Sequence, residues 1–142
     1  METIAPSPLP KSESITELDL KLIEVSSLCG SVSWQLDGQS DGATACNCTA
    51  CRRYGTLWAY GYVDEDIRTQ GETRAYVRHN AVLEFHFCPK CGCMAFWRGL
   101  GADETGKTRI AVNLRLSEPN SVAQIPIDHF QRGFNTTSYS AL

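Results

Sequence analysis

The sequence predicts a mainly β protein whose compact antiparallel sheets are stabilised by zinc. Apolar and polar residues alternate with a period of two in several short segments, as expected for strands with one buried face. Glycine, proline and aspartate turn signals separate these segments, and no long segment has a helical period. Seven cysteines, most of them clustered, supply the thiolate ligands that zinc prefers. Together these observations indicate a metal-stabilised β fold.

One domain and two tails are expected within the 142 residues. Residues 1–17 contain three prolines but few large apolar side chains, so they are predicted to be a flexible N-terminal tail. Residues 18–134 are predicted to form the zinc domain, and residues 135–142 a C-terminal tail. A domain of this length buries roughly two thirds of the surface that its unfolded chain exposes, so it can hold a real core.

The alternation is clearest in three segments, which are SVSWQLD, AVLEFHF and RIAVNLRL at residues 31–37, 81–87 and 109–116. Each predicts a half-buried strand. The residues expected on the buried faces are Val32, Trp34 and Leu36; Ala81, Leu83, Phe85 and Phe87; and Ile110, Val112, Leu114 and Leu116. A short helical turn is expected only in TACRRYG, at residues 49–55.

Charge and hydropathy weigh against two classes of partner. The formal net charge is -3 and the chain has no run of Lys and Arg, so nucleic acid is not expected as a partner. No segment approaches the roughly 20 apolar residues that span a bilayer, and the N-terminal residues lack the basic and apolar parts of a secretory signal. We therefore expect a cytoplasmic protein without membrane contact.

The cysteines form two clusters and one isolated position. An odd number cannot be fully paired in intramolecular disulfides, and clustered cysteines in a reducing compartment favour metal binding. The first cluster, the second cluster and the isolated residue are Cys46, Cys48 and Cys51; Cys88, Cys91 and Cys93; and Cys29.

The segment CPKCG is typical of a zinc knuckle, in which a tight turn presents Cys88 and Cys91 to one metal ion. A closed site needs two further ligands. Cys29 precedes a predicted strand and is expected to reach the knuckle across the sheet, while Cys93 is the nearest candidate for the fourth position. The alternative is that Cys93 is only a small buried apolar residue.

The remaining cluster, Cys46, Cys48 and Cys51, is too short to supply a fourth sulfur of its own. A zinc ion bound there by three thiolates has an open position and a net charge of about -1, which suits a soft thiol substrate better than an amide or ester. The substrate thiol should lose its proton on binding. The alternative is a second closed site in which a histidine is the fourth ligand, and the candidates are His79, His86 and His129.

Arg52 and Arg53 directly follow this cluster. Their charge could offset the anionic zinc and bind a substrate carboxylate, or they could be a solvated basic pair.

Aromatic residues follow both clusters. Those after the first cluster could line a pocket or pack in the sheet, and they are Tyr54, Trp58, Tyr60 and Tyr62. Phe96 and Trp97, after the knuckle, are expected to cover its metal site from water.

Three spaced motifs occur in order: Cys29-Gly30-x-Val32, Cys46-x-Cys48-x-x-Cys51-Arg52-x-x-Gly55, and Phe87-Cys88-x-x-Cys91-Gly92. Over about residues 20–130 they resemble the glutathione-dependent formaldehyde-activating enzyme family, which also includes centromere protein V. The resemblance implies a compact fold of tent-like β sheets with two zinc ions, one structural and one catalytic.

The resemblance also implies which cysteines bind each ion. By this resemblance, the catalytic zinc is bound by Cys46, Cys48 and Cys51, and the structural zinc by Cys29, Cys88 and Cys91. The sequence departs from the family at the remaining structural ligand, because the first cysteine of a C-x-C pair is replaced by Ser27. Cys93 could substitute for it, water could complete the site, or the site could be weakened; the division of seven cysteines into four and three favours Cys93.

The activity implied by the resemblance is that of a zinc-dependent carbon-sulfur lyase acting on a thiol or thioether adduct. The reaction in the family name is the formation of S-hydroxymethylglutathione from glutathione and formaldehyde, so glutathione is the expected small-molecule partner. The alternative is a non-catalytic, zinc-stabilised binding module for protein or nucleic acid. A third interpretation, redox sensing through the first cluster, requires thiols that are free of metal.

Overall fold

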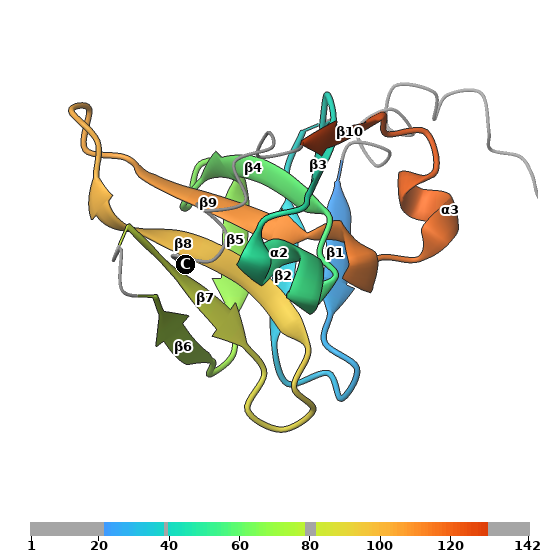
Figure 1. Ribbon diagram of the computed structural model, residues 1–142, viewed down its shortest axis with the longest axis horizontal. Helices are drawn as coiled ribbons and strands as arrows, with labels where there is room; N and C mark the ends of the chain where they lie inside the picture. Colours follow the sequence, from blue (N-terminus) through green and yellow to red (C-terminus); the bar gives the residue numbers. More distant parts are fainter. Residues whose placement is uncertain (1–21, 39, 79–81, 131–142) are drawn as a thin grey trace, which may run out of the picture.

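The computed structural model describes residues 22–38, 40–78 and 82–130. Its strands form a three-stranded sheet and a seven-stranded sheet that pack face to face (Figure 1). Both sheets are antiparallel except where the last strand pairs, so the prediction of a mainly β fold is confirmed. The two predicted tails, residues 1–17 and 135–142, lie outside the described residues.

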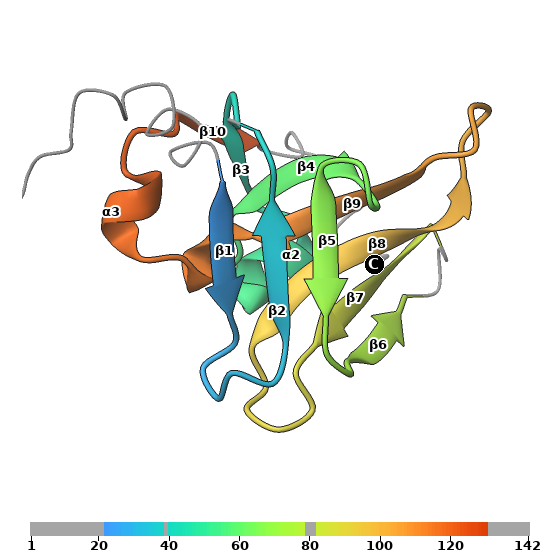
Figure 2. The same cartoon turned by 180° about the vertical axis from the view of Figure 1, so that it is seen from behind.

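The small sheet has the order β1-β2-β5 and lies at the front of Figure 2. Its strands are β1 (Ile23–Ser26), β2 (Ser33–Leu36) and β5 (Ile67–Gln70). The predicted alternation in residues 31–37 is confirmed, because Val32, Trp34 and Leu36 are all buried. Their side chains face the large sheet and form one side of the core.

The large sheet has the order β10-β3-β4-β9-β8-β7-β6. Only the β10–β3 pair is parallel. Its strands are β3 (Ala43–Cys46), β4 (Trp58–Tyr62), β6 (Arg74–Val77), β7 (Leu83–Phe87), β8 (Met94–Ala102), β9 (Thr108–Asn113) and β10 (Ile127–Phe130).

The two faces of the large sheet carry separate apolar clusters. In β9, Ile110 and Val112 face the small sheet, whereas Ala111 belongs to the cluster on the opposite face. In β4, Ala59 faces the small sheet, whereas Trp58 belongs to the cluster on the opposite face. This is the period of two expected for a strand covered on both sides. The second face is where a short helix and the first cysteine cluster lie.

That helix, α2 (Thr49–Tyr54), confirms the helical turn predicted in TACRRYG. The Cys48 side chain accepts a hydrogen bond from the backbone N–H of Cys51 at the first turn. Gly55 ends the helix with φ of 67°, a left-handed conformation that glycine adopts without a steric penalty. Both ends of the helix are therefore specified locally.

The strand predicted for residues 109–116 is wrong in its second half. Strand β9 ends at Asn113, and Leu114–Leu116 form a 3-10 turn, called η2. The Asn113 side chain accepts the Arg115 N–H and so caps this turn, which a binary apolar pattern cannot reveal. Leu114 is still buried.

A second short helix, α3 (Pro119–Val122), leads toward β10. Within the described residues, no helix combines the length and the apolar character that crossing a bilayer requires.

Candidate metal centres

The first cysteine cluster gathers at the junction between β3 and α2. Cys46 is the last residue of β3, Cys48 caps the helix, and Cys51 lies in its first turn. The three sulfur atoms lie within 4.8 Å of one another. The chain passes from β3 almost directly into α2, and this brings together the sulfurs of three cysteines that are separated by at most five residues. We call this cluster of sulfurs the triplet.

A buried tryptophan supports the triplet from the sheet. The Trp58 Nε1–H donates a hydrogen bond to Cys51 Sγ at 3.2 Å, and only 1% of Trp58 is exposed. Backbone N–H groups also point at sulfurs: that of Cys48 donates to Cys46 Sγ at 3.5 Å, and that of Cys51 to Cys48 Sγ at 3.4 Å. Hydrogen bonds of this kind orient metal-binding thiolates and tune their basicity.

The three thiols of the triplet do not share their protons evenly. Hydrogen bonds from the thiols of Cys46 and Cys51 hold the pKa of Cys48 far below that of an ordinary cysteine. Hydrogen bonding to the Cys46 and Cys48 sulfurs, together with burial, raises the pKa of Cys51. The three thiols therefore titrate as one coupled group, and a metal ion bound there would have to displace their protons.

The triplet has suitable chemistry and size for zinc. With Zn–S bonds of about 2.3 Å, tetrahedral geometry places two thiolates about 3.8 Å apart. Sulfurs that already lie within 4.8 Å need only small side-chain movements to reach that spacing. The triplet can therefore hold a metal ion such as zinc.

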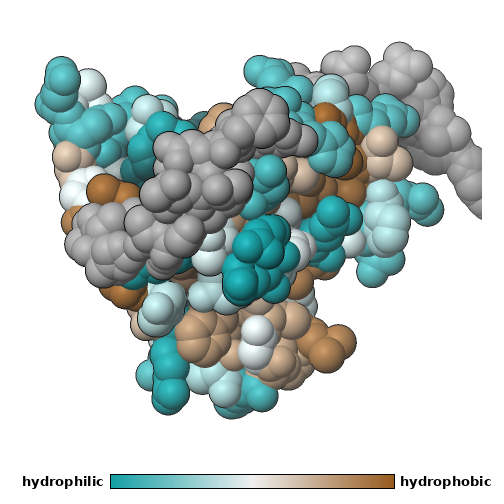
Figure 3. Space-filling model, in the orientation of Figure 1, coloured by the Kyte–Doolittle hydropathy of each residue, from teal (hydrophilic) through white to brown (hydrophobic). Residues whose placement is uncertain are grey.

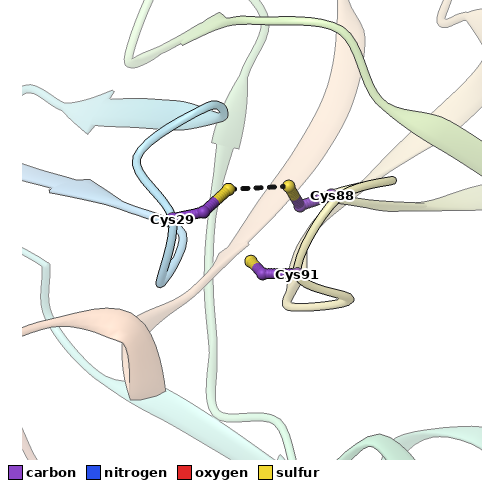
Figure 4. A group of neighbouring side chains, drawn as sticks. All are labelled: Cys29, Cys88 and Cys91. Atoms are coloured by element: carbon purple, nitrogen blue, oxygen red, sulfur yellow. Dashed lines mark hydrogen bonds between the residues drawn. The ribbon is translucent and has the colours of Figure 1, made fainter.

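A second group of sulfurs joins the two sheets. Cys29 comes from the loop between β1 and β2, whereas Cys88 and Cys91 come from the loop between β7 and β8 (Figure 4). Their sulfurs also lie within 4.8 Å of one another, and those of Cys29 and Cys88 are 3.5 Å apart. We call this group the bridging site.

The knuckle predicted for CPKCG is present. The backbone N–H of Gly92 donates to the Cys88 carbonyl at 2.9 Å, and Gly92 has φ of 82°. Backbone N–H groups of Cys93 and Cys29 lower the pKa of Cys91 to about 6. The turn and the facing loop between β1 and β2 thus place donors around a sulfur whose pKa is lowered.

Cys93 and Ser27 flank the bridging site. Among the described residues, the group of mutually close sulfurs contains three cysteines, and Cys93 is not one of them. Its sulfur accepts the Leu28 N–H at 3.4 Å, beside Cys29. Ser27 is buried, its Oγ lies 3.8 Å from Cys29 Sγ, and it accepts the Val32 N–H at 3.3 Å. The structure therefore brings both candidates close and leaves the fourth ligand as a prediction.

The histidines do not close the triplet within the described residues. His86 bonds Thr73 Oγ1 at 2.7 Å and Glu84 Oε2 at 2.9 Å, and it stacks on Phe96, whose side chain lies on the other face of the sheet. His129 lies in β10 outside both sulfur groups. His79 lies outside the described residues. An open position at the triplet therefore stays the favoured interpretation.

The other predicted residues divide between the two centres. Arg52 and Arg53 are exposed on α2, and Arg53 Nη1 donates back to the Thr49 carbonyl at 3.1 Å. Phe96 belongs to the same core cluster as Cys88, and its role as a cover for the metal site stays a prediction. Trp97 does not belong to that cluster, because it lies on the opposite face with its ring 6.5 Å from that of Trp58.

The aromatic residues after the first cluster are split between core and surface. Trp58 is buried beneath the triplet, whereas Tyr54 and Tyr60 are partly exposed beside it. Packing in the sheet is thus confirmed for Trp58, whereas a pocket-lining role for the tyrosines stays a prediction. The hydrogen bond from Trp58 to Cys51 was not anticipated, and no sequence signal distinguishes Trp58 from the neighbouring aromatic residues.

Comparisons with known proteins agree with this geometry. The family model described as "Glutathione-dependent formaldehyde-activating enzyme" matches residues 22–126. A crystal structure of a Rhodobacter sphaeroides protein is similar in fold, with a TM-score of 0.56 and 22% identity. The alignment covers 75% of this chain and 100% of that one. Among curated proteins, none matches this chain.

Proposed function

Because this chain belongs to the glutathione-dependent formaldehyde-activating enzyme family, we propose that it is a zinc-dependent carbon-sulfur lyase acting on a thiol or thioether adduct. The reaction to test first is the condensation of glutathione with formaldehyde to S-hydroxymethylglutathione. In that reaction the glutathione sulfur forms a bond to the formaldehyde carbon, and the thiol proton ends on the formaldehyde oxygen. Such a thiol is abundant in the reducing cytoplasm, where we expect the protein to act.

The observation that carries the proposal is that the triplet lacks, within the described part of the chain, a candidate fourth ligand such as Cys93, which lies beside the bridging site. Cys46, Cys48 and Cys51 form a group of three sulfurs, with no fourth His, Cys, Asp or Glu ligand among the described residues. When bound there, zinc supplies a position for a substrate sulfur and favours its thiolate form. Catalytic zinc sites typically have three protein ligands and one exchangeable position.

Each residue around the triplet has a proposed role. The three cysteines hold the metal, and Trp58 orients Cys51 through its indole N–H. Arg52 is exposed on α2 and forms no ion pair with a carboxylate of the described residues, so its guanidinium is available to a substrate carboxylate. Arg53 is the second candidate for that role, although its bond to the helix backbone competes.

The proposal is tested by the zinc content and the reaction together. We expect two zinc ions per chain by elemental mass spectrometry when the protein is purified without chelator, or one ion that rises to two after glutathione is added and the sample is desalted. Formation of S-hydroxymethylglutathione should then exceed the uncatalysed rate, measured by exchange NMR. One zinc ion under all conditions, with no acceleration, would instead support a zinc-stabilised binding module.

Replacement of Cys93 by alanine is expected to weaken the bridging site. If Cys93 is the fourth ligand, zinc should be lost to a chromogenic chelator about tenfold faster or more. Addition of Ser27→Cys to the Cys93→Ala variant should restore zinc retention, because the Ser27 Oγ already lies 3.8 Å from the Cys29 Sγ. Unchanged retention in the Cys93→Ala variant would show that Cys93 is a small packing residue.

Trp58→Phe is expected to change the electronic character of the triplet without removing a ligand. Loss of the N–H donor makes the Cys51 thiolate more electron-rich, so the sulfur-to-cobalt charge-transfer band of the cobalt-substituted protein should shift to lower energy. Trp97→Phe is the matched control, because Trp97 lies on the same face with its ring 6.5 Å from that of Trp58. Identical spectra for wild type and Trp58→Phe would contradict the role given to this hydrogen bond.

A further inference from the structure

A pocket of about 500 Å³ opens beside α2, between β6 and the loop that follows β7. In Figure 3, apolar surface gathers on the lower part of the face that carries α2, below the hydrophilic surface of the helix. The residues of the pocket that carry the argument are Tyr54, Arg74, Tyr76, Phe87 and Met94.

The lining combines apolar walls with one positive side chain. Tyr54, Tyr76 and Phe87 provide aromatic rings, and Tyr76 is 53% exposed although it is a large apolar residue. Arg74 is the charged residue of the lining, and Arg78 is close enough for its charge to act on the Tyr54 phenol. Among the described residues, no carboxylate lines the pocket. Such a surface is complementary to a ligand with an apolar group and a negative charge.

The pocket is continuous with the packing around the triplet. Tyr54 follows Cys51 by three residues on α2, a spacing that places both on one side of a helix. The Tyr54 ring lies 5.2 Å from that of Phe85, which shares an apolar cluster with Cys51 and Met94. Tyr54 thus borders the pocket and belongs to the helix that carries Cys51, so a ligand seated against Tyr54 lies beside the helix that carries part of the triplet.

We propose that this pocket binds the apolar, carboxylate-bearing arm of the thiol or thioether substrate whose sulfur reaches the triplet. This inference rests on the proposed function and narrows its substrate class. Its volume lies within the range of about 300–1,000 Å³ found for small-molecule sites. The rings would contact the apolar group, and Arg74 would bind the carboxylate.

Two ligands test binding in the pocket separately from the reaction at the triplet. The first is 3-phenylpropionate, which has an aromatic ring and a carboxylate but no sulfur, so its binding does not require the metal. Titration into the full ¹⁵N-labelled chain should shift amide signals of β6, the end of α2 and Gly92, with similar affinity in wild type and Cys48→Ser. The second is S-benzylglutathione, which we expect to bind the zinc-loaded protein about tenfold tighter than S-methylglutathione in calorimetry.

Variants on β6 test the residues. Arg74→Ala should weaken 3-phenylpropionate binding about fivefold or more, and Tyr76→Ser should reduce the preference for S-benzylglutathione to less than about threefold. Val77→Ser is the matched control, because Val77 is an exposed neighbour on the same strand that does not line the pocket. It should change both affinities by less than about twofold.

The outcomes distinguish this inference from the proposed function. If zinc and lyase activity are present but 3-phenylpropionate shifts no signals at these positions, the pocket is not a ligand site and the inference is wrong. If 3-phenylpropionate binds but S-benzylglutathione has no advantage over S-methylglutathione, the pocket does not serve the triplet's substrate, which also overturns it. Absence of zinc from the triplet together with absence of activity would reject the proposed function, whatever 3-phenylpropionate does.

Discussion

Cys91→Ser is expected to lower the melting temperature by about 15 °C or more, or to prevent folding altogether. The bridging site connects Cys29 on the small-sheet side with Cys88 and Cys91 on the large-sheet side. Binding of a structural zinc stabilises small domains by about 10 kcal/mol or more at neutral pH, which is comparable to their whole stability. Removal of one of its ligands therefore removes a cross-link between the two layers of the fold.

The measurement is thermal unfolding followed by circular dichroism, with zinc content determined on the same sample. Lys90→Ser is the matched control, because Lys90 is an exposed residue of the same turn and does not belong to the sulfur group. It should melt within about 2 °C of wild type. A Cys91→Ser variant that melts with the wild type would show that the metal at the bridging site does not hold the sheets together.

Cys48→Ser is expected to abolish turnover while the fold survives. The triplet lies at the junction of β3 and α2, on the face of the large sheet that does not contact the small sheet. A metal bound there would link residues that are already close in sequence, so its loss is expected to destabilise the fold less than loss of a zinc ion bound at the bridging site. We expect one zinc ion fewer per chain, a fall in turnover of about a thousandfold, and a melting temperature within about 5 °C of wild type.

The two serine variants control for each other, since each removes one thiol from a group of three. Zinc content, turnover and melting temperature should be measured on both in parallel. Equal melting temperatures would overturn the division into one structural and one catalytic centre. Full activity in Cys48→Ser would show that the triplet is not where the reaction takes place.

Much of the fold could be predicted because its strands are amphipathic. In residues 31–37 the expected buried residues Val32, Trp34 and Leu36 face the core. Leu83, Phe85 and Phe87 likewise belong to one cluster, while Ala81 of the same segment lies outside the described residues. The pattern was misleading at Leu114, where a side-chain cap by Asn113 changes strand to 3-10 turn while burial is preserved.

The grouping of the cysteines could also be predicted, because short spacings restrict which sulfurs can meet. Cys46, Cys48 and Cys51 are separated by at most five residues, so a turn into a helix is sufficient to gather them. The meeting of Cys29 with the knuckle was suggested by the resemblance and by the need for further ligands. The structure places their sulfurs together across a separation of 59 residues.

The amino-acid pattern alone was enough to indicate the β fold, the family and the two clusters of cysteines, because alternation and short cysteine spacings are local properties of the chain. The tertiary structure decided what depends on distant contacts: that Trp58 donates to Cys51, that Phe96 and Trp97 serve opposite faces, and that β6 forms a pocket with α2. These features arise only when strands far apart in sequence pair in one register, since a shift by one residue would exchange the two faces.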